Sequence, residues 1–220
     1  MQAKLGLVPF DAAEAETEIM AGPYIEYSGP ALGIFKLSRQ MMLFVLPMMT
    51  MRLLAEEKKL GTIELLLTSP VTNLQIVLGK YLASLALLTI MIGLSFIHQF
   101  ILLIYGNPEL LPILAGYLGM LLMGASFLAL GLLISSFTDS QVVAGFVSFG
   151  LFLLLWVIGW AENFAGPLLG KFFAFICFIN HFTDFAKGVV DTKHIVFYLS
   201  AIFLGLFLTE RTLESWKWRQ

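Results

Sequence analysis

Long apolar runs without charge are the feature that most constrains this chain. From Leu111 to Phe137 the sequence contains no charged side chain, and a helix needs only about 20 apolar residues to cross a bilayer. Over the whole chain 59% of residues are hydrophobic and 13% are charged, against roughly 45–50% and 25% in soluble domains. Lipid must therefore be the solvent of this protein. Its 220 residues leave no room for a second, soluble enzyme domain.

The pattern of apolar and polar segments predicts an all-α membrane protein with about five transmembrane helices. The spans are predicted at about 33–54, 81–104, 111–137, 142–160 and 191–209. Together they make one transmembrane domain over residues 33–209. An acidic extramembrane segment precedes it at 1–32, and a tail follows at 210–220. The basic side chains of this tail, together with Trp216 and Trp218, predict an anchor at the level of the lipid headgroups. The apolar stretch 168–179 is too short to cross and predicts a re-entrant or interfacial helix.

The polar segment between the first two spans, residues 52–80, predicts a rigid elbow. We expect the first helix to continue beyond the membrane to Lys59 and to end at Gly61, which readily takes the left-handed conformation. Residues 62–67 form an amphipathic pattern that stops before Pro70. Thr72 followed three residues later by Gln75 is a capping box, which predicts the next helix start. Such an elbow would give a soluble partner a rigid, protruding docking surface. The alternative interpretation is that these residues are only solvated charges between two helices.

Catalytic and cofactor motifs are absent from the sequence. HExxH, GxSxG and a cysteine pair do not occur. The stretch from Gly166 to Lys171 differs from a phosphate loop in its glycine spacing, and no Ser or Thr follows the lysine. We therefore expect no enzyme activity, no cofactor and no ATP binding by this chain alone. Cys177 is the only cysteine, so a Cys-based zinc site is excluded. No basic block indicates nucleic acid.

Several other residues allow two interpretations each. His98 and Gln99 in the second span are candidates for a transport pathway, and the alternative is that they join helices by hydrogen bonds. The methionines between Met41 and Met51 suggest soft-metal handling, but methionine is also common apolar filler, and we assign no metal site. Small residues four apart in the third span favour close helix packing, either within the chain or between subunits.

The elbow carries a family resemblance. The segment Met51–Lys80, above all Arg52-Leu-Leu-Ala-Glu-Glu-Lys-Lys-Leu-Gly-Thr-Ile-Glu-Leu-Leu-Leu-Thr-Ser-Pro70, resembles the coupling region of type-2 permeases of ATP-binding-cassette (ABC) exporters, closest to the gliding-motility branch. Pro112–Gly119, Gly131–Thr138 and His181–Asp191 resemble the same branch. The resemblance covers the chain from Phe35 onward.

The resemblance implies a multi-pass permease subunit of the inner cell membrane that exports a substrate. Its implied partners are two cytoplasmic ABC ATPase subunits and a second permease subunit, identical or different. It also implies that the elbow and the tail at 210–220 are cytoplasmic and that the region from Glu162 to Lys193 is an external polar lid. The residues expected to couple to the ATPase are Glu56, Glu57, Lys58, Lys59, Ile63, Glu64, Leu66 and Leu67. His98 and Gln99 remain the pathway candidates.

One feature departs from the family pattern. Permeases of this family usually begin with an amphipathic helix and a further spanning helix, whereas no apolar run precedes Gly33. We expect either five working spans or a truncated reading frame. The alternative function, from a different class, is a non-transporting membrane assembly or scaffold protein with the elbow as its docking site.

Overall fold

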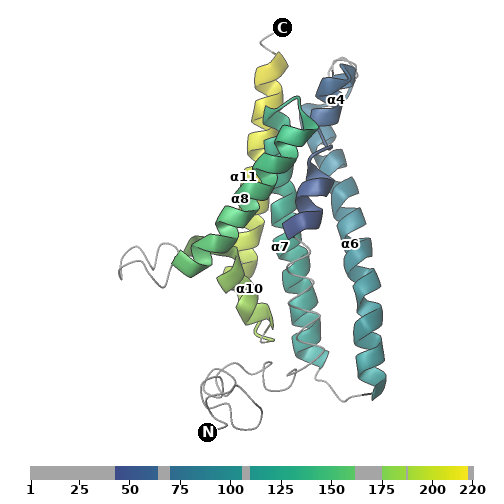
Figure 1. Cartoon of the computed structure of the whole chain (residues 1–220), viewed down its shortest axis with the longest axis vertical. Coiled ribbons are helices and arrows are strands. Elements are labelled where there is room, and N and C mark those ends of the chain that lie inside the picture. The colour runs from purple at the N-terminus through teal and green to yellow at the C-terminus, as the bar shows by residue number, and fades with distance from the viewer. Residues whose placement is uncertain (1–42, 64–69, 106–109, 162–174, 187, 218–220) are drawn as a thin grey trace.

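The computed structural model describes residues 43–63, 70–105, 110–161, 175–186 and 188–217. Within these ranges the chain is helical and contains no strand. Figure 1 shows the helices side by side along one long axis. A helical stretch at residues 43–50 is followed by α4 (Ala55–Lys59), α6 (Asn73–Tyr105), α7 (Leu110–Phe137), α8 (Gln141–Ala161), α10 (Phe178–Ala186) and α11 (Thr192–Lys217).

Four of these helices are long and apolar enough to cross a membrane. The candidate spans are Asn73–Ile97, Leu111–Phe137, Gln141–Gly159 and Thr192–Trp216. The expectation of an all-α membrane protein is thus confirmed. Residues 33–42 of the first predicted span, 33–54, lie outside the described residues, so the count of five remains a prediction.

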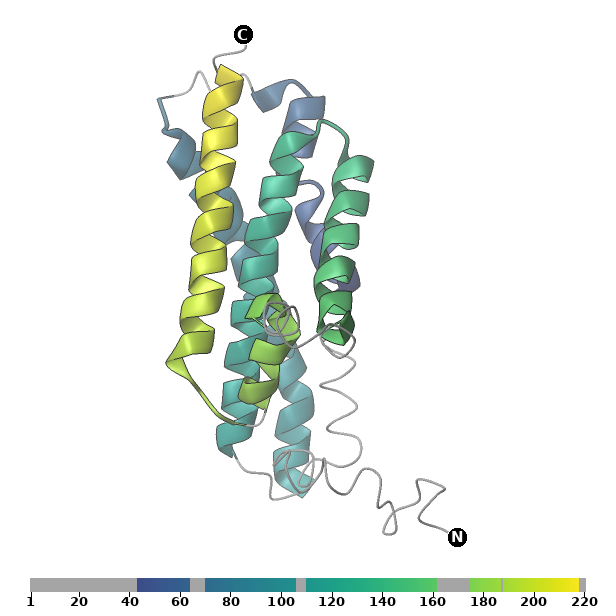
Figure 2. The same ribbon diagram turned by 90° about the vertical axis from the view of Figure 1, so that its left-hand side faces the viewer.

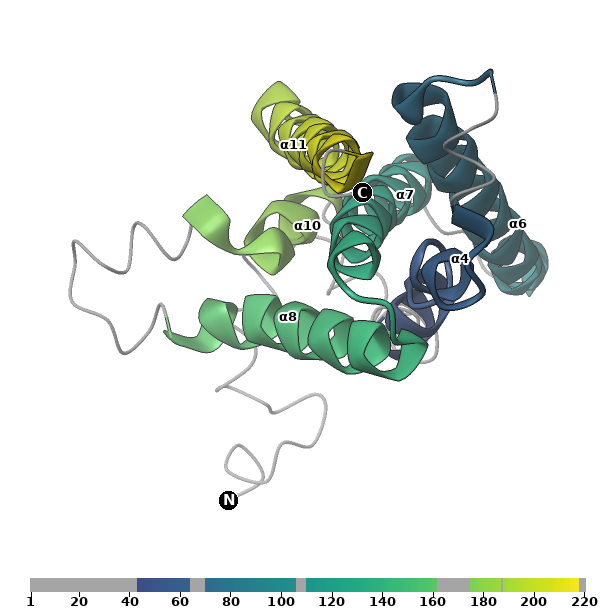
Figure 3. The same cartoon turned by 90° about the horizontal axis from the view of Figure 1, so that it is seen from above.

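Helix α7 is the central helix of the bundle. In an 18-residue apolar window of α7, 67% of the residues are buried. The corresponding share is 22% in each of α6, α8 and α11. Seen from above in Figure 3, α7 lies among α4, α6, α8, α10 and α11. The outer faces carry large exposed side chains such as Leu94, Phe146 and Phe203. A bundle with an apolar exterior is what a lipid solvent requires.

Small residues on α7 let its neighbours come close. A Cβ atom added at Gly119 would lie 2.7 Å from Phe185 of α10, and one added at Gly131 would lie 2.5 Å from Thr50. Gly205 of α11 packs in the same way against the Ala129 backbone. Of the two interpretations of the small residues in this span, these contacts support packing within the chain.

The first helix differs from its prediction. We expected it to run unbroken to Lys59, but residues 51–54 form a turn and the helix resumes as α4. The physical reason is a competing hydrogen-bond acceptor on α7, described below. The predicted end of this helix is confirmed, because Gly61 adopts the left-handed conformation, with a φ of 71°.

The short helix predicted at residues 168–179 lies mostly outside the described residues, which omit 162–174. The described helix in this region is α10, Phe178–Ala186. Phe178, Phe182 and Phe185 follow the helical period and are buried together. This amphipathic pattern fixes how α10 packs against its neighbours, because its apolar stripe is buried.

Residues 210–217 of the predicted tail continue helix α11. Helix α11 continues past residue 209 to Lys217, and Figure 2 shows it running beside α7 to the end of the bundle at which α4 lies. Leu213 is 1% exposed and Arg211 pairs with Glu214 one turn later at 2.6 Å. A buried apolar residue and an i,i+3 ion pair keep the helix going beyond its spanning part.

Candidate functional site

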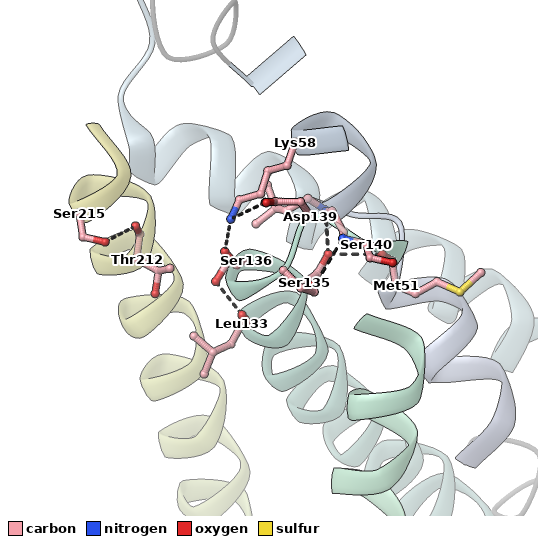
Figure 4. Close-up of polar contacts among 12 residues, drawn as sticks. Met51, Lys58, Leu133, Ser135, Ser136, Asp139, Ser140, Thr212 and Ser215 are labelled. Carbon is pink, nitrogen blue, oxygen red and sulfur yellow. Dashed lines mark hydrogen bonds and ion pairs between the residues drawn. The ribbon is translucent and has the colours of Figure 1, made fainter. Parts of the chain in front are cut away.

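The polar contacts that join α4 to other helices lie at one end of the bundle. Figure 4 shows α4 beside the end of α7, the turn that leads to α8, and the last turns of α11. Of the elbow residues expected to couple to a partner, those that the structure describes lie at this end, in α4 and just after it: Glu56, Glu57, Lys58, Lys59 and Ile63. The close-up also contains residues that sequence reasoning did not select.

Ser135 of α7 caps the start of α4 from another helix. Its Oγ atom accepts hydrogen bonds from the backbone N–H groups of Leu54 at 3.1 Å and Ala55 at 3.0 Å. The N-cap residue of α4 has no side-chain capping bond of its own. Because the first N–H groups of a helix lack partners within the helix, the buried hydroxyl of Ser135 satisfies two of them. This acceptor explains why the chain turns at residues 51–54 instead of continuing as one helix.

Lys58 points from α4 into the bundle rather than outward. Its side chain is fully buried, and its ammonium donates a hydrogen bond to the carbonyl oxygen of Ser136 in the last turn of α7. The same ammonium lies 3.8 Å from Asp139 Oδ1 and 3.9 Å from the ring centroid of Trp216. A cation is stabilised at a helix C-terminus and over an indole face. Lys58 thereby joins α4 to α7 and α11.

Burial sets the acid–base behaviour of Lys58. Desolvation lowers the pKa of its ammonium below the usual range, and the charge and hydrogen bonding of Asp139 oppose this shift. Since Asp139 is largely exposed, water weakens that compensation. The net direction is downward because removing a lysine from water costs more than one exposed carboxylate returns.

Glu57 ties α4 to the other arm of the elbow. Its carboxylate forms an ion pair with Lys80 of α6, and both side chains are partly buried.

The predicted capping box fixes the start of α6, and both of its hydrogen bonds are present. The Thr72 N–H donates to Gln75 Oε1 at 3.0 Å, and the Gln75 N–H donates to Thr72 Oγ1 at 3.3 Å.

The outward side of the elbow is formed by other residues. Lys59 is exposed, Glu56 is half-buried, and Leu60 is 66% exposed. Ile63, by contrast, belongs to the hydrophobic core and is 5% exposed. Glu64, Leu66 and Leu67 lie outside the described residues.

The two pathway candidates lie on α6. Gln99 is 2% exposed, and its Oε1 atom has no hydrogen-bond partner. The His98 side chain lies outside the described part of the chain. Among the described residues no group of three or more His, Cys, Asp and Glu side chains is arranged to hold a metal ion.

Sequence reasoning missed Ser135, Asp139 and Trp216. A signal for the first two existed, because Ser135-Ser136-Phe137-Thr138-Asp139-Ser140 is a polar cluster that ends an otherwise apolar helix. Trp216 was interpreted as a headgroup anchor, and nothing in the sequence connects it with Lys58. Contacts between residues so far apart in the chain depend on helix packing, which composition does not reveal.

An all-helical bundle with an apolar exterior and four candidate spans defines a multi-pass membrane protein. The family model described as ABC-2 family transporter protein matches residues 7–206, and the chain belongs to this family. It is therefore the membrane permease component of an ABC transporter, a transport subunit that works with ABC ATPase subunits. The match begins before Phe35 and so includes most of the acidic N-terminal segment.

Proposed function

We propose that this chain is the permease of an ATP-driven exporter in the inner cell membrane, of the gliding-motility type, and that the elbow at residues 52–80 is its docking site for the ATPase. The supporting observation is the attachment of α4 to three other helices. Ser135 and Lys58 fix it to α7, Trp216 to α11, and Glu57 to α6. A partner that pulls on α4 therefore moves the bundle and not a loose loop.

Within this proposal the eight elbow residues have two kinds of role. Glu57, Lys58 and Ile63 are turned into the chain and hold the elbow in place. Glu56 and Lys59, together with Leu60, meet the ATPase. We assign Glu64, Leu66 and Leu67 to the same contact on the basis of the amphipathic pattern at residues 62–67. His98 and Gln99 remain the proposed pathway residues.

Co-purification with the ATPase tests the proposal. The variant Leu60→Asp places a charge on the outward side of the elbow, and Val189→Asp is a matched control, since Val189 is 55% exposed in the loop before α11. We expect Leu60→Asp to lose the ATPase and its stimulated hydrolysis, while Val189→Asp keeps both. Equal ATPase recovery with both variants would overturn the assignment of the docking site and favour a scaffold role.

A further inference from the structure

A buried polar cluster joins α10 to the first turn of α11. His181 of α10 is 9% exposed and His194 of α11 is 4% exposed. Their Nδ1 atoms are 2.5 Å apart. His194 Nε2 lies 2.8 Å from Asp184 Oδ2, and His181 Nε2 lies 3.0 Å from the carbonyl oxygen of Phe175. A carbonyl, two imidazoles and a carboxyl group thus form one continuous chain of hydrogen bonds.

The number of protons in this cluster follows from its donors and acceptors. The Phe175 carbonyl only accepts, so His181 Nε2 must carry a hydrogen. One further hydrogen must lie between the two Nδ1 atoms, and one between His194 Nε2 and the Asp184 carboxyl group. Two neutral rings with a carboxylate supply only two of these three hydrogens. The observed geometry therefore holds one proton in excess, shared along the cluster.

The geometry suits a proton and not a metal ion. A zinc ion between two imidazole nitrogens needs about 2.0 Å to each of them, whereas these two Nδ1 atoms are 2.5 Å apart. The ring of His181 also stacks on Phe197, with centroids 4.0 Å apart. This stacking fixes the ring plane and keeps Nδ1 directed at His194.

Few charges act on the cluster. Besides Asp184, the described charged groups that affect the two rings are Lys193 and Asp191, which pair with each other at 3.1 Å. Helices α7 and α8, which pack against α10, contain no charged residue. Burial lowers the pKa of His181 below its ordinary value, partly offset by the bond to Phe175 and the charge of Asp184. His181 therefore takes up a second proton only in acid.

We propose that His181, His194 and Asp184 form an acid-sensitive latch that fastens α10 to α11 while one proton is shared and releases α10 when a second proton binds. With both rings charged, two Nδ1–H donors face each other, and the hydrogen bond becomes a repulsive contact. Gly188, with a φ of 79°, supplies the turn about which α10 swings. The latch goes beyond the proposed ATPase coupling and does not depend on it.

The direction of the pH dependence follows from the lowered pKa of His181. Above the ordinary histidine value of about 6.5 the second proton is absent from both the folded and the unfolded chain, so it does not weaken the latch. As the pH falls through the lower value in the folded chain, the stabilisation from the latch is lost. Acid should therefore loosen α10 without unfolding the spanning helices.

Cys177 provides a built-in reporter for this release. It is the only cysteine in the sequence, is fully buried, and directly precedes α10. The full-length protein in detergent is treated with dithiodipyridine, which reacts with thiols in acid, and rates are divided by those of the denatured protein at each pH. We expect this ratio to rise about tenfold or more between about pH 7.5 and 5.5.

Two substitutions separate the latch from general acid loosening. His181→Phe keeps a ring against Phe197 but cannot take a proton, and it should remove the pH dependence of the ratio. His98→Gln changes the one histidine outside the cluster and should retain that dependence. A wild-type ratio that does not change with pH, or an unchanged acid response in His181→Phe, would overturn the proposal.

Nuclear magnetic resonance of the ¹⁵N-histidine-labelled wild-type protein tests the shared proton without any substitution in the latch. Two rings that share a proton should titrate as a coupled pair, with Nδ1 signals between those of free protonated and free deprotonated nitrogen. Two independent titrations near pH 6.5 would contradict the latch.

Discussion

The backbone nitrogen of Leu54 lies 3.1 Å from Oγ of Ser135, and this hydrogen bond joins residues 81 positions apart. Through it a side chain of the central helix determines where the elbow begins. The same hydroxyl accepts from the Ala55 nitrogen. The orientation of α4 thus depends on α7, and not only on the chain that leads into it.

Ser135→Ala should loosen the elbow. The change leaves two buried N–H groups without an acceptor, at a cost of about 1–3 kcal/mol in the free energy of unfolding. Ser136→Ala is the matched control, because within the described part of the chain the Ser136 hydroxyl donates to the Leu133 carbonyl of its own helix. Thermal unfolding in detergent compares the two variants. Equal melting temperatures for both would contradict the capping role of Ser135.

The buried ammonium of Lys58 predicts a pH dependence. With its pKa lowered in the folded chain, the unfolded chain binds more protons than the folded one between that value and about 10.5. The free energy of unfolding of the wild type, relative to Lys58→Met, should therefore rise with pH in this interval. Denaturant titrations from neutral pH upward measure it. Lys59→Met controls for removal of an exposed charge from the same helix, and a difference that stays constant with pH would refute the expectation.

Exchanging two charges tests the contact between α4 and α6. Glu57→Lys and Lys80→Glu each place like charges together and should reduce the stimulated ATPase rate of the complex. The double variant restores the opposite charges and should recover most of that rate. If the ATPase rate of the double variant falls by the combined losses of the two single variants, the Glu57–Lys80 pair does not hold the elbow.

Gly131→Ala tests the packing of residues 43–50 against α7. A Cβ atom at this position would lie 2.5–2.6 Å from three atoms of Thr50, so we expect a loss of about 1–3 kcal/mol in the free energy of unfolding. Gly150→Ala on α8 is the control, since a Cβ atom there meets nothing within 4 Å. It should be neutral or slightly stabilising because alanine favours a helix. Equal stability of the two variants would show that the bundle separates easily at Thr50.

The sequence predicted features that depend on local chemistry. The all-helical membrane fold follows from apolar runs, the start of α6 from the Thr72–Gln75 pair, and the end of α4 from Gly61. Prediction from sequence failed where a residue far away in the chain determines the local structure. The turn at residues 51–54 depends on Ser135, and the inward direction of Lys58 depends on Ser136 and Trp216. A run of charges in sequence does not reveal which of them face the protein.

Chemical cross-linking from the outward side of the elbow tests the central claim most directly. In a Cys177→Ala background, Leu60→Cys and Val189→Cys each supply one exposed thiol, at the elbow and before α11 respectively. In the complex with the ATPase, a short thiol-to-amine cross-linker should join the permease to the ATPase in the Leu60→Cys variant and leave Val189→Cys unjoined. Cross-linking of Val189→Cys alone would contradict the proposal that the elbow is the docking site.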